Sequence, residues 1–166
     1  MRLTDCRKKT VCLWKNKNSK LSKQARKEGT SMSHSKFKLF IENLDPDVEF
    51  DQDKIQELCA DTDEETVLKI LARFHQTLVD SIEKIQAAIE AVDVEVVWKT
   101  SHKISGSAEL LGFVEYGHEA RQLSHDLRAN TDFSHNSKKI NNFLNRTKIL
   151  KLKIMKSIPA LNDFLV

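Results

Sequence analysis

The chain has 166 residues, of which 40% are apolar and 31% charged, and it contains only four glycines and two prolines. This composition is typical of a soluble helical protein, and the length suits one domain with a hydrophobic core. No apolar run approaches the roughly 20 residues that span a membrane, and the N-terminus lacks the apolar core of a signal peptide. We therefore expect a cytoplasmic protein without a membrane span.

The net charge of +3 combines two segments of opposite charge. Residues 1–35 contain ten of the 27 basic residues and two of the 24 acidic ones, so the rest of the chain is net acidic. A segment so rich in charge and so poor in apolar side chains cannot bury enough surface to offset its ordering entropy. We expect a flexible basic arm over 1–35, which is either dispensable or a contact for nucleic acid or another anionic surface.

The first two helices of the body begin at polar residues that can cap them. Asp51 can cap a short helix that carries Ile55 and Leu58. Thr62 or Asp63 can cap a much longer helix, which reaches about residue 91. Along this second helix apolar residues recur every three or four positions, so one of its faces is expected to lie in a core.

Three further helices follow in the sequence pattern. Asp93 can cap the third helix, Gly112 ends or kinks it, and a fourth helix is expected over 114–129. The stretch 130–137 is polar and turn-rich, so we expect the last helix to begin at about 137 and to break at Pro159.

Long helices joined by short links are typical of a bundle. No strand alternation or hairpin signal interrupts the pattern, and no internal repeat is present. We therefore predict an all-α fold, an antiparallel four-helix bundle with an extra short helix at its N-terminal end. This domain is expected over 50–166, with the flexible basic arm over 1–35 as a separate segment.

The third helix contains the most unusual segment of the chain, TSHKISGSAELLGF over 100–113, in which a glycine follows a histidine by one turn. Glycine in a helix interior costs about 1 kcal/mol relative to alanine, so we infer that open space beside His102 is useful. In a projection at 100° per residue, His102 lies roughly 130° from the centre of the core-facing stripe, with Gly106 beside it and Lys99 and Lys103 further round. The stripe consists of Val94, Val97, Ser101, Ile104, Ala108 and Leu111.

An exposed imidazole on a rigid helix, beside lysines, has the properties of a nucleophile towards phosphorus. In a neutral imidazole one ring nitrogen keeps a free lone pair, and Lys99 and Lys103 would attract an anion. Ser105 could add a hydroxyl donor. Trp98, one turn earlier, either lies at the shoulder of the bundle or forms part of a docking patch. The plain alternative is that His102 is an exposed histidine without a role.

The motif HKxxGSA over 102–108 and the GF pair at 112–113 resemble the signature of histidine-containing phosphotransfer (HPt) domains. The resemblance extends to the helices before and after the motif. It implies that His102 accepts a phosphoryl group from a receiver-domain aspartate. It also implies that Gly106 gives the receiver access and that Lys103 contacts the phosphoryl group.

The chain departs from that family pattern at two positions. Many members carry lysine three residues after the histidine, where this chain has Ser105. Some carry glutamine at the position of Ser124, near which this chain has Gln122. We therefore place Ser105 with Lys103 among the phosphate-contacting candidates. The candidates for docking of the partner are Lys99, Gly106, Trp98 and Gln122.

The resemblance implies a phosphorelay intermediate that passes the phosphoryl group on to an aspartate of a response regulator. The partners would be receiver domains and a hybrid sensor histidine kinase, Mg²⁺ would be held by the receiver, and the chain itself would need no cofactor. Four glycines can hardly build the Gly-rich loop that binds ATP. We therefore expect a monomeric phosphocarrier, not an enzyme with kinase activity of its own.

Two other functions stay open at this point. A helical interaction module could bind nucleic acid through the basic arm. His118 and His125 share a face of the fourth helix with Glu115 and Gln122, and such residues build metal sites in some bundles. No second helix supplies matching carboxylates, so we expect a solvated or partner-facing surface without a metal ion.

Overall fold

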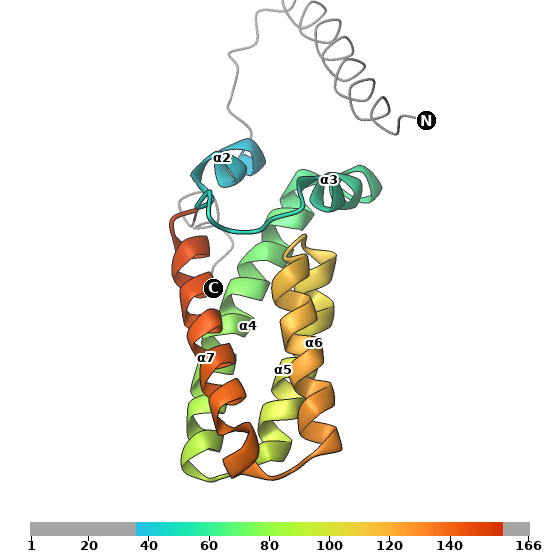
Figure 1. Cartoon of the computed structure of the whole chain (residues 1–166). Coiled ribbons are helices and arrows are strands. Elements are labelled where there is room, and N and C mark those ends of the chain that lie inside the picture. Colours follow the sequence, from blue (N-terminus) through green and yellow to red (C-terminus); the bar gives the residue numbers. More distant parts are fainter. Residues whose placement is uncertain (1–35, 158–166) are drawn as a thin grey trace, which may run out of the picture. The chain divides into compact units, whose positions relative to one another are not determined.

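The computed structural model describes residues 36–157, and within that range it contains six helices and no strand (Figure 1). The predicted all-α fold is confirmed. The predicted basic arm over 1–35 and the predicted helix break at Pro159 lie outside the described residues. The helices are α2 (Lys36–Asn43), α3 (Gln52–Asp61), α4 (Glu64–Glu90), α5 (Val94–Leu110), α6 (Val114–Ala129) and α7 (Phe133–Met155).

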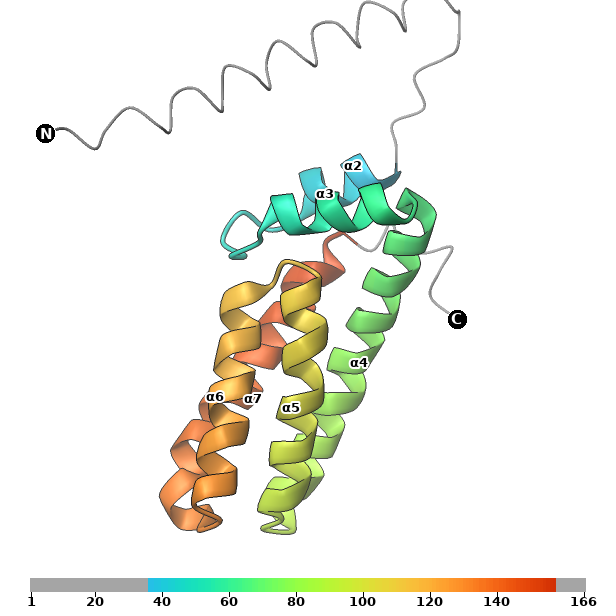
Figure 2. The ribbon, with the colours of Figure 1, turned by 90° about the vertical axis from the view of Figure 1, so that its right-hand side faces the viewer.

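The four long helices form the antiparallel bundle that the sequence predicts. Helix α5 packs against α4 and α6, and α7 packs against the same two helices from the other side. In Figures 1 and 2 successive long helices reverse direction, with short links between them. The shorter helices α2 and α3 both pack against α4. This arrangement leaves one side of every long helix facing away from the shared core.

Aspartates cap four of the described helices, three of them at the expected places. The side chains of Asp51, Asp63 and Asp93 accept backbone N–H groups at the starts of α3, α4 and α5, as predicted. Helix α7 begins four residues earlier than predicted, at Phe133, because Asp132 caps it through the N–H of Ser134 at 2.9 Å. The polar residues before 137 therefore build a helix start and not an open turn.

The core-facing side of α5 is the predicted one. All six residues of the expected stripe are buried. Asp93 starts the helix beside this stripe, and Gly112 ends it. The rotation of α5 about its own axis therefore follows from the apolar spacing, as amphipathic helices bury the face that carries their apolar residues.

One end of the bundle is built from aromatic rings and includes a helix that the sequence pattern did not predict. Phe40 of α2 is fully buried, and its ring centroid lies 6.4 Å from that of Phe50. Phe50 lies 5.1 Å from Phe113, which stacks on Phe74 of α4 at 5.4 Å. These contacts tie α2 and the loop before α3 to the turn between α5 and α6.

Gly112 makes that turn possible. Its φ of +84° lies in the left-handed region that favours glycine. A Cβ at this position would lie 2.5 Å from the carbonyl oxygen of Asp51, whose own N–H donates to the Gly112 carbonyl at 2.8 Å. Gly112 therefore ends α5 and also lets the start of α3 approach the α5–α6 turn.

Candidate functional site: the exposed face of α5

The α5–α6 hairpin sets the position of every candidate site residue. The two helices run side by side in Figures 1 and 2. They approach closely at Gly117, where a Cβ would lie 2.5 Å from Cγ of Glu109 and 3.1 Å from the carbonyl oxygen of Ser105. Gly117 thus faces the turn of α5 that begins at Ser105. Because the helices are antiparallel, the next turn of α6 lies level with the turn of α5 that carries His102.

His102 lies on the solvent-exposed part of α5, as predicted. Within residues 36–157 its ring makes no hydrogen bond or ion pair. Gly106, one turn later, is also exposed, and a Cβ built there would meet nothing within 4 Å. The folded chain therefore does not need the glycine for its own packing. The space beside the imidazole is open to a partner molecule.

The lysines near His102 differ in how they are held. Lys99 pairs with Glu95 one turn earlier, at 2.5 Å, with both side chains more than half exposed. Such surface pairs contribute little and exchange readily. Lys103 is exposed and has no hydrogen-bond or ion-pair partner in the described part of the chain. The positive patch is thus weaker around Lys99 than the sequence suggests, while Lys103 is available to an anion.

Trp98 lies at the shoulder between core and surface, partly buried against the hydrophobic core. The guanidinium of Arg128, from α6, lies 5.3 Å from its ring centroid, and the amine of Lys99 lies 5.8 Å away. Cations over an indole face are held by the ring quadrupole. Trp98 therefore joins α5 to α6 one turn before His102.

Ser105 is buried, contrary to the prediction that it contacts the phosphoryl group. It is only 3% exposed, and its hydroxyl donates to the carbonyl oxygen of His102 at 2.8 Å. Because the helix backbone satisfies the hydroxyl, the serine can face the core without an unpaired polar group. It does not lie on the exposed face with His102, so its proposed contact with phosphate is dropped. Ser124, at the position where some family members carry glutamine, is buried as well.

Gln122 is predicted as a docking residue, but its side chain is engaged away from α5. Its amide donates to Asp126 at 2.8 Å, and Asp126 also accepts from Lys139 of α7 at 2.6 Å. Two arginines of α6 have side chains that contact α5, Arg121, which pairs with Glu109, and Arg128, which lies over the ring of Trp98. Neither arginine is among the residues predicted from the sequence.

A signal for these arginines exists in the pattern of the hairpin. Gly117 in the interior of α6 is as unusual as Gly106 in α5, and it marks the line along which the two helices approach. Residues four and eleven positions beyond it share the same face of α6 and are Arg121 and Arg128. Gln122 is one residue off that line.

The other histidines within residues 36–157 do not offer the same surroundings. His118 and His125 are exposed on α6 and line a shallow depression with Arg121 and Gln122. His75 of α4 is 7% exposed, and neither of its ring nitrogens has a hydrogen-bond partner in the described range. Burial, and secondarily the charge of Lys151, lower the pKa of His75. A partner cannot reach this ring in the folded state.

No group of three His, Cys, Asp or Glu side chains in residues 36–157 lies close enough to hold a metal ion. The four acidic residues near 61–65 include Asp63, which caps α4 and accepts from both the N–H and the hydroxyl of Thr66. These two hydrogen bonds lower the pKa of Asp63. The acidic group thus serves the helix start, as its position in the sequence suggests.

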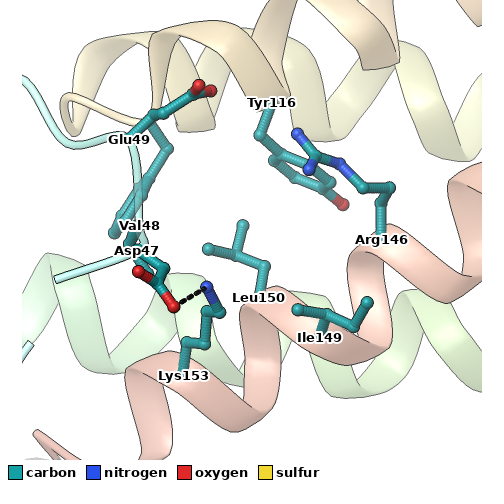
Figure 3. Close-up of a pocket in the computed structure, with 9 residues that line it drawn as sticks. Asp47, Val48, Glu49, Tyr116, Arg146, Ile149, Leu150 and Lys153 are labelled. Carbon is teal, nitrogen blue, oxygen red and sulfur yellow. Dashed lines mark ion pairs between the residues drawn. The ribbon is translucent and has the colours of Figure 1, made fainter. Parts of the chain in front are cut away.

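A pocket is present elsewhere on the bundle, between α7, the start of α6 and the loop before α3 (Figure 3). Its two cationic side chains are already paired, Arg146 with Glu119 at 3.0 Å and Lys153 with Asp45 at 3.6 Å. The ion pair from Lys153 to Asp47 drawn in Figure 3 measures 3.9 Å. None of the predicted site residues lines this pocket.

None of the helices in the described range combines the length and the apolarity that crossing a membrane requires.

The fold and the site together define a class of protein, a helical bundle that presents one unengaged histidine beside an open glycine on an exposed helix face. Residues 69–148 match the family model described as the Hpt domain. This range runs from α4 into α7 and includes all of α5. This part of the chain is therefore an HPt domain, and HPt domains serve histidine phosphotransfer in phosphorelays as phosphocarriers. Comparison with curated proteins and with solved structures gave no match.

Proposed function

We propose that His102 is the phosphoacceptor of a phosphorelay, taking a phosphoryl group from the aspartate of one receiver domain and passing it to another. One observation carries this proposal. Among the exposed histidines of the described range, His102 is the one followed a turn later by glycine, with open space where a side chain would stand. His118, His125 and His135 are followed at that position by glutamine, alanine and lysine.

The proposed step is an in-line displacement at phosphorus. The lone pair of the neutral imidazole nitrogen forms the N–P bond while the P–O bond to the donor aspartate breaks, and its electron pair stays on the aspartate carboxylate. The ring becomes positively charged and then releases the proton of its other nitrogen to water. The reverse sequence delivers the group to a second aspartate. Positioning and charge neutralisation are the main requirements of such a transfer.

The chain supplies only part of this machinery. Mg²⁺ and the acidic residues that hold it would come from the receiver partner, and a hybrid sensor histidine kinase would supply the phosphoryl group. The sequence has no Gly-rich loop for ATP, which supports a phosphocarrier and not an autonomous kinase. Lys103 would contact the transferring group, since its amine has no partner in the described part of the chain. Trp98, Lys99 and Gly106 would form the docking surface around the histidine.

Three expectations from the sequence stay predictions. These are a cytoplasmic location, a monomeric state, and an interaction of the basic arm with nucleic acid or another anionic surface. The arm falls outside the described residues, so it adds nothing to the argument for His102.

Incubation with a phosphorylated receiver domain tests the proposal. We expect acid-labile, alkali-stable phosphate on the wild-type chain and none on His102→Gln. The matched controls are His118→Gln and His125→Gln, which remove exposed histidines from the neighbouring helix and should label like wild type. Labelling that survives in His102→Gln, or disappears in a control variant, would show that another histidine is the acceptor.

A further inference from the structure

We propose that Arg121 is shared between two anions on the same face of α5. In the unphosphorylated protein it pairs with Glu109, and in the phosphorylated protein it moves to the phosphoryl group on His102. This inference rests on the proposed function of His102. Besides Lys103 of α5, it adds Arg121 of α6 as a phosphate-contacting residue. It also makes Glu109 a competitor that binds Arg121 while His102 is unphosphorylated.

The resting partner of Arg121 is well defined. Its Nη2 lies 2.5 Å from Oε2 of Glu109, whose side chain is 20% exposed while that of Arg121 is 51% exposed. The second carboxylate oxygen of Glu109 is buried and has no hydrogen-bond partner in the described range. Gly117 leaves the room in which the Glu109 side chain lies. The carboxylate is thus held against α6, and one half-exposed arginine neutralises it.

The geometry of the hairpin places Arg121 within reach of both anions. His102 and Glu109 are seven residues apart, which is two turns, so they share a face of α5 about 10 Å apart along the axis. Gly117 faces Ser105 and Glu109, and Arg121 is one turn further along α6, level with the turn of His102. Helix side chains lean towards the N-terminus of their own helix, which carries the guanidinium of Arg121 back to Glu109. A rotamer that does not lean back points it at His102.

The charges explain why the arginine would move. A guanidinium binds phosphate through parallel N–H···O bonds, and bonds between two ionised groups are roughly twice as strong as neutral ones. The pair with Glu109 uses one oxygen of a carboxylate whose side chain is only 20% exposed. A phosphoryl group on His102 offers three acceptor oxygens and more negative charge than one carboxylate. Arg121 therefore stabilises the phosphorylated protein, and Glu109 competes with it.

The test is the equilibrium distribution of phosphate between this chain and a purified receiver domain. We expect Arg121→Gln to lower the share on the chain by about tenfold, the loss of one charge-assisted contact. We expect Glu109→Gln to raise it several-fold, because the competitor is removed. The matched control is Arg73→Gln, which removes an exposed arginine on α4 and should leave the share unchanged.

Arg121→Gln leaves the largely buried carboxylate of Glu109 unpaired, so circular dichroism and thermal unfolding accompany each measurement. The double variant Glu109→Gln with Arg121→Gln removes both charges and should lower the share as Arg121→Gln alone does. An Arg121→Gln share equal to that of Arg73→Gln, or a Glu109→Gln share that does not rise, would overturn this inference while His102 still labels. A wild-type chain that takes no phosphate would instead refute the proposed function, and this inference with it.

Discussion

Two glycines in adjacent helices of the bundle have opposite surroundings. Gly117 of α6 is buried against α5, where a methyl group would collide with the Glu109 side chain and with the backbone at Ser105. Gly106 of α5 is exposed, and a methyl group there would meet nothing within 4 Å. Glycine destabilises a helix interior relative to alanine, and both positions carry this cost. The fold explains the glycine at 117, while only something outside the chain explains the one at 106.

Two kinds of helix-interior glycine look alike in a sequence and differ only in the folded structure. A helix-interior glycine can mark a close contact within the protein or an approach from outside it. On the outer side of α6, by contrast, several charged groups are already engaged, as in the pairs of Asp126 with Lys139 and of Glu119 with Arg146. An unengaged histidine beside unused space is therefore a better indication of a site than a concentration of charge.

Among the glycine variants, the largest expected effect on phosphoryl transfer comes from filling the open space at Gly106. Gly106→Gln should slow phosphoryl transfer from a receiver domain by about tenfold or more, equivalent to roughly 1.4 kcal/mol or more in the activation free energy. The long side chain would stand where the partner approaches, while the fold stays intact. Rapid-quench measurement of the transfer rate checks this, with thermal unfolding to confirm the fold. A normal transfer rate would mean that the partner does not use this space.

At Gly117, by contrast, we expect a substitution to lower the stability of the fold. Gly117→Ala is expected to destabilise the protein by about 2 kcal/mol, because overpacking a tight contact forces the helices apart. Chemical denaturation at fixed pH measures the change. A variant as stable as wild type would indicate that α5 and α6 do not approach closely at this position, and the register that places Arg121 beside His102 would fail with it.

Gly106→Ala should change the free energy of unfolding less than Gly117→Ala does, and in the opposite direction. A methyl group at an open helix position removes the glycine penalty, so we expect the free energy of unfolding to rise by about 1 kcal/mol. Transfer should change far less than in Gly106→Gln, since alanine adds one carbon. Denaturation and transfer assays on the same samples separate these effects. Loss of stability in this variant would contradict the open surroundings of Gly106.

Much of the bundle could be predicted because its signals are local. The caps at Asp51, Asp63 and Asp93 depend on a side chain and an N–H group two or three residues away. Helix α2 depends instead on Phe40 meeting Phe50 across a loop, which no periodicity within eight residues reveals. The start of α7 was placed too late because capping and turn formation favour the same polar residues.

The same distinction applies to the candidate site. His102 and Gly106 belong to one helix, so their shared exposure follows from the helical repeat. Which residue of α6 borders them depends on how two helices are rotated against each other, and that is fixed by the contact between Gly117 and Glu109. Gln122 lies one residue from Arg121, a rotation of about 100°, and its amide donates to Asp126 instead. Ser105 was misplaced because a satisfied hydroxyl can be buried.

The smallest expected effect is a pH dependence of the protein's stability that comes from the buried His75. Burial lowers the pKa of His75, so the unfolded chain, with an ordinary value near 6.5, binds a proton more readily than the folded protein. Stability should therefore be full above about pH 7 and fall as the pH drops through 6.5, by up to about 1 kcal/mol between pH 7.5 and 5.5. The carboxyl groups with lowered pKa, such as those of Asp45 and Asp126, respond only below about pH 4.

Denaturant titrations at several pH values on two variants check the source of this dependence. His75→Leu removes the buried titrating group and should flatten the stability profile between pH 7.5 and 5.5. His102→Gln removes an exposed histidine and should keep the wild-type profile, even though it is expected to abolish phosphoryl transfer. If His102→Gln flattened the profile instead, the exposed ring would be coupled to folding, and the separation between a histidine in the core and a histidine left free for a partner would not hold.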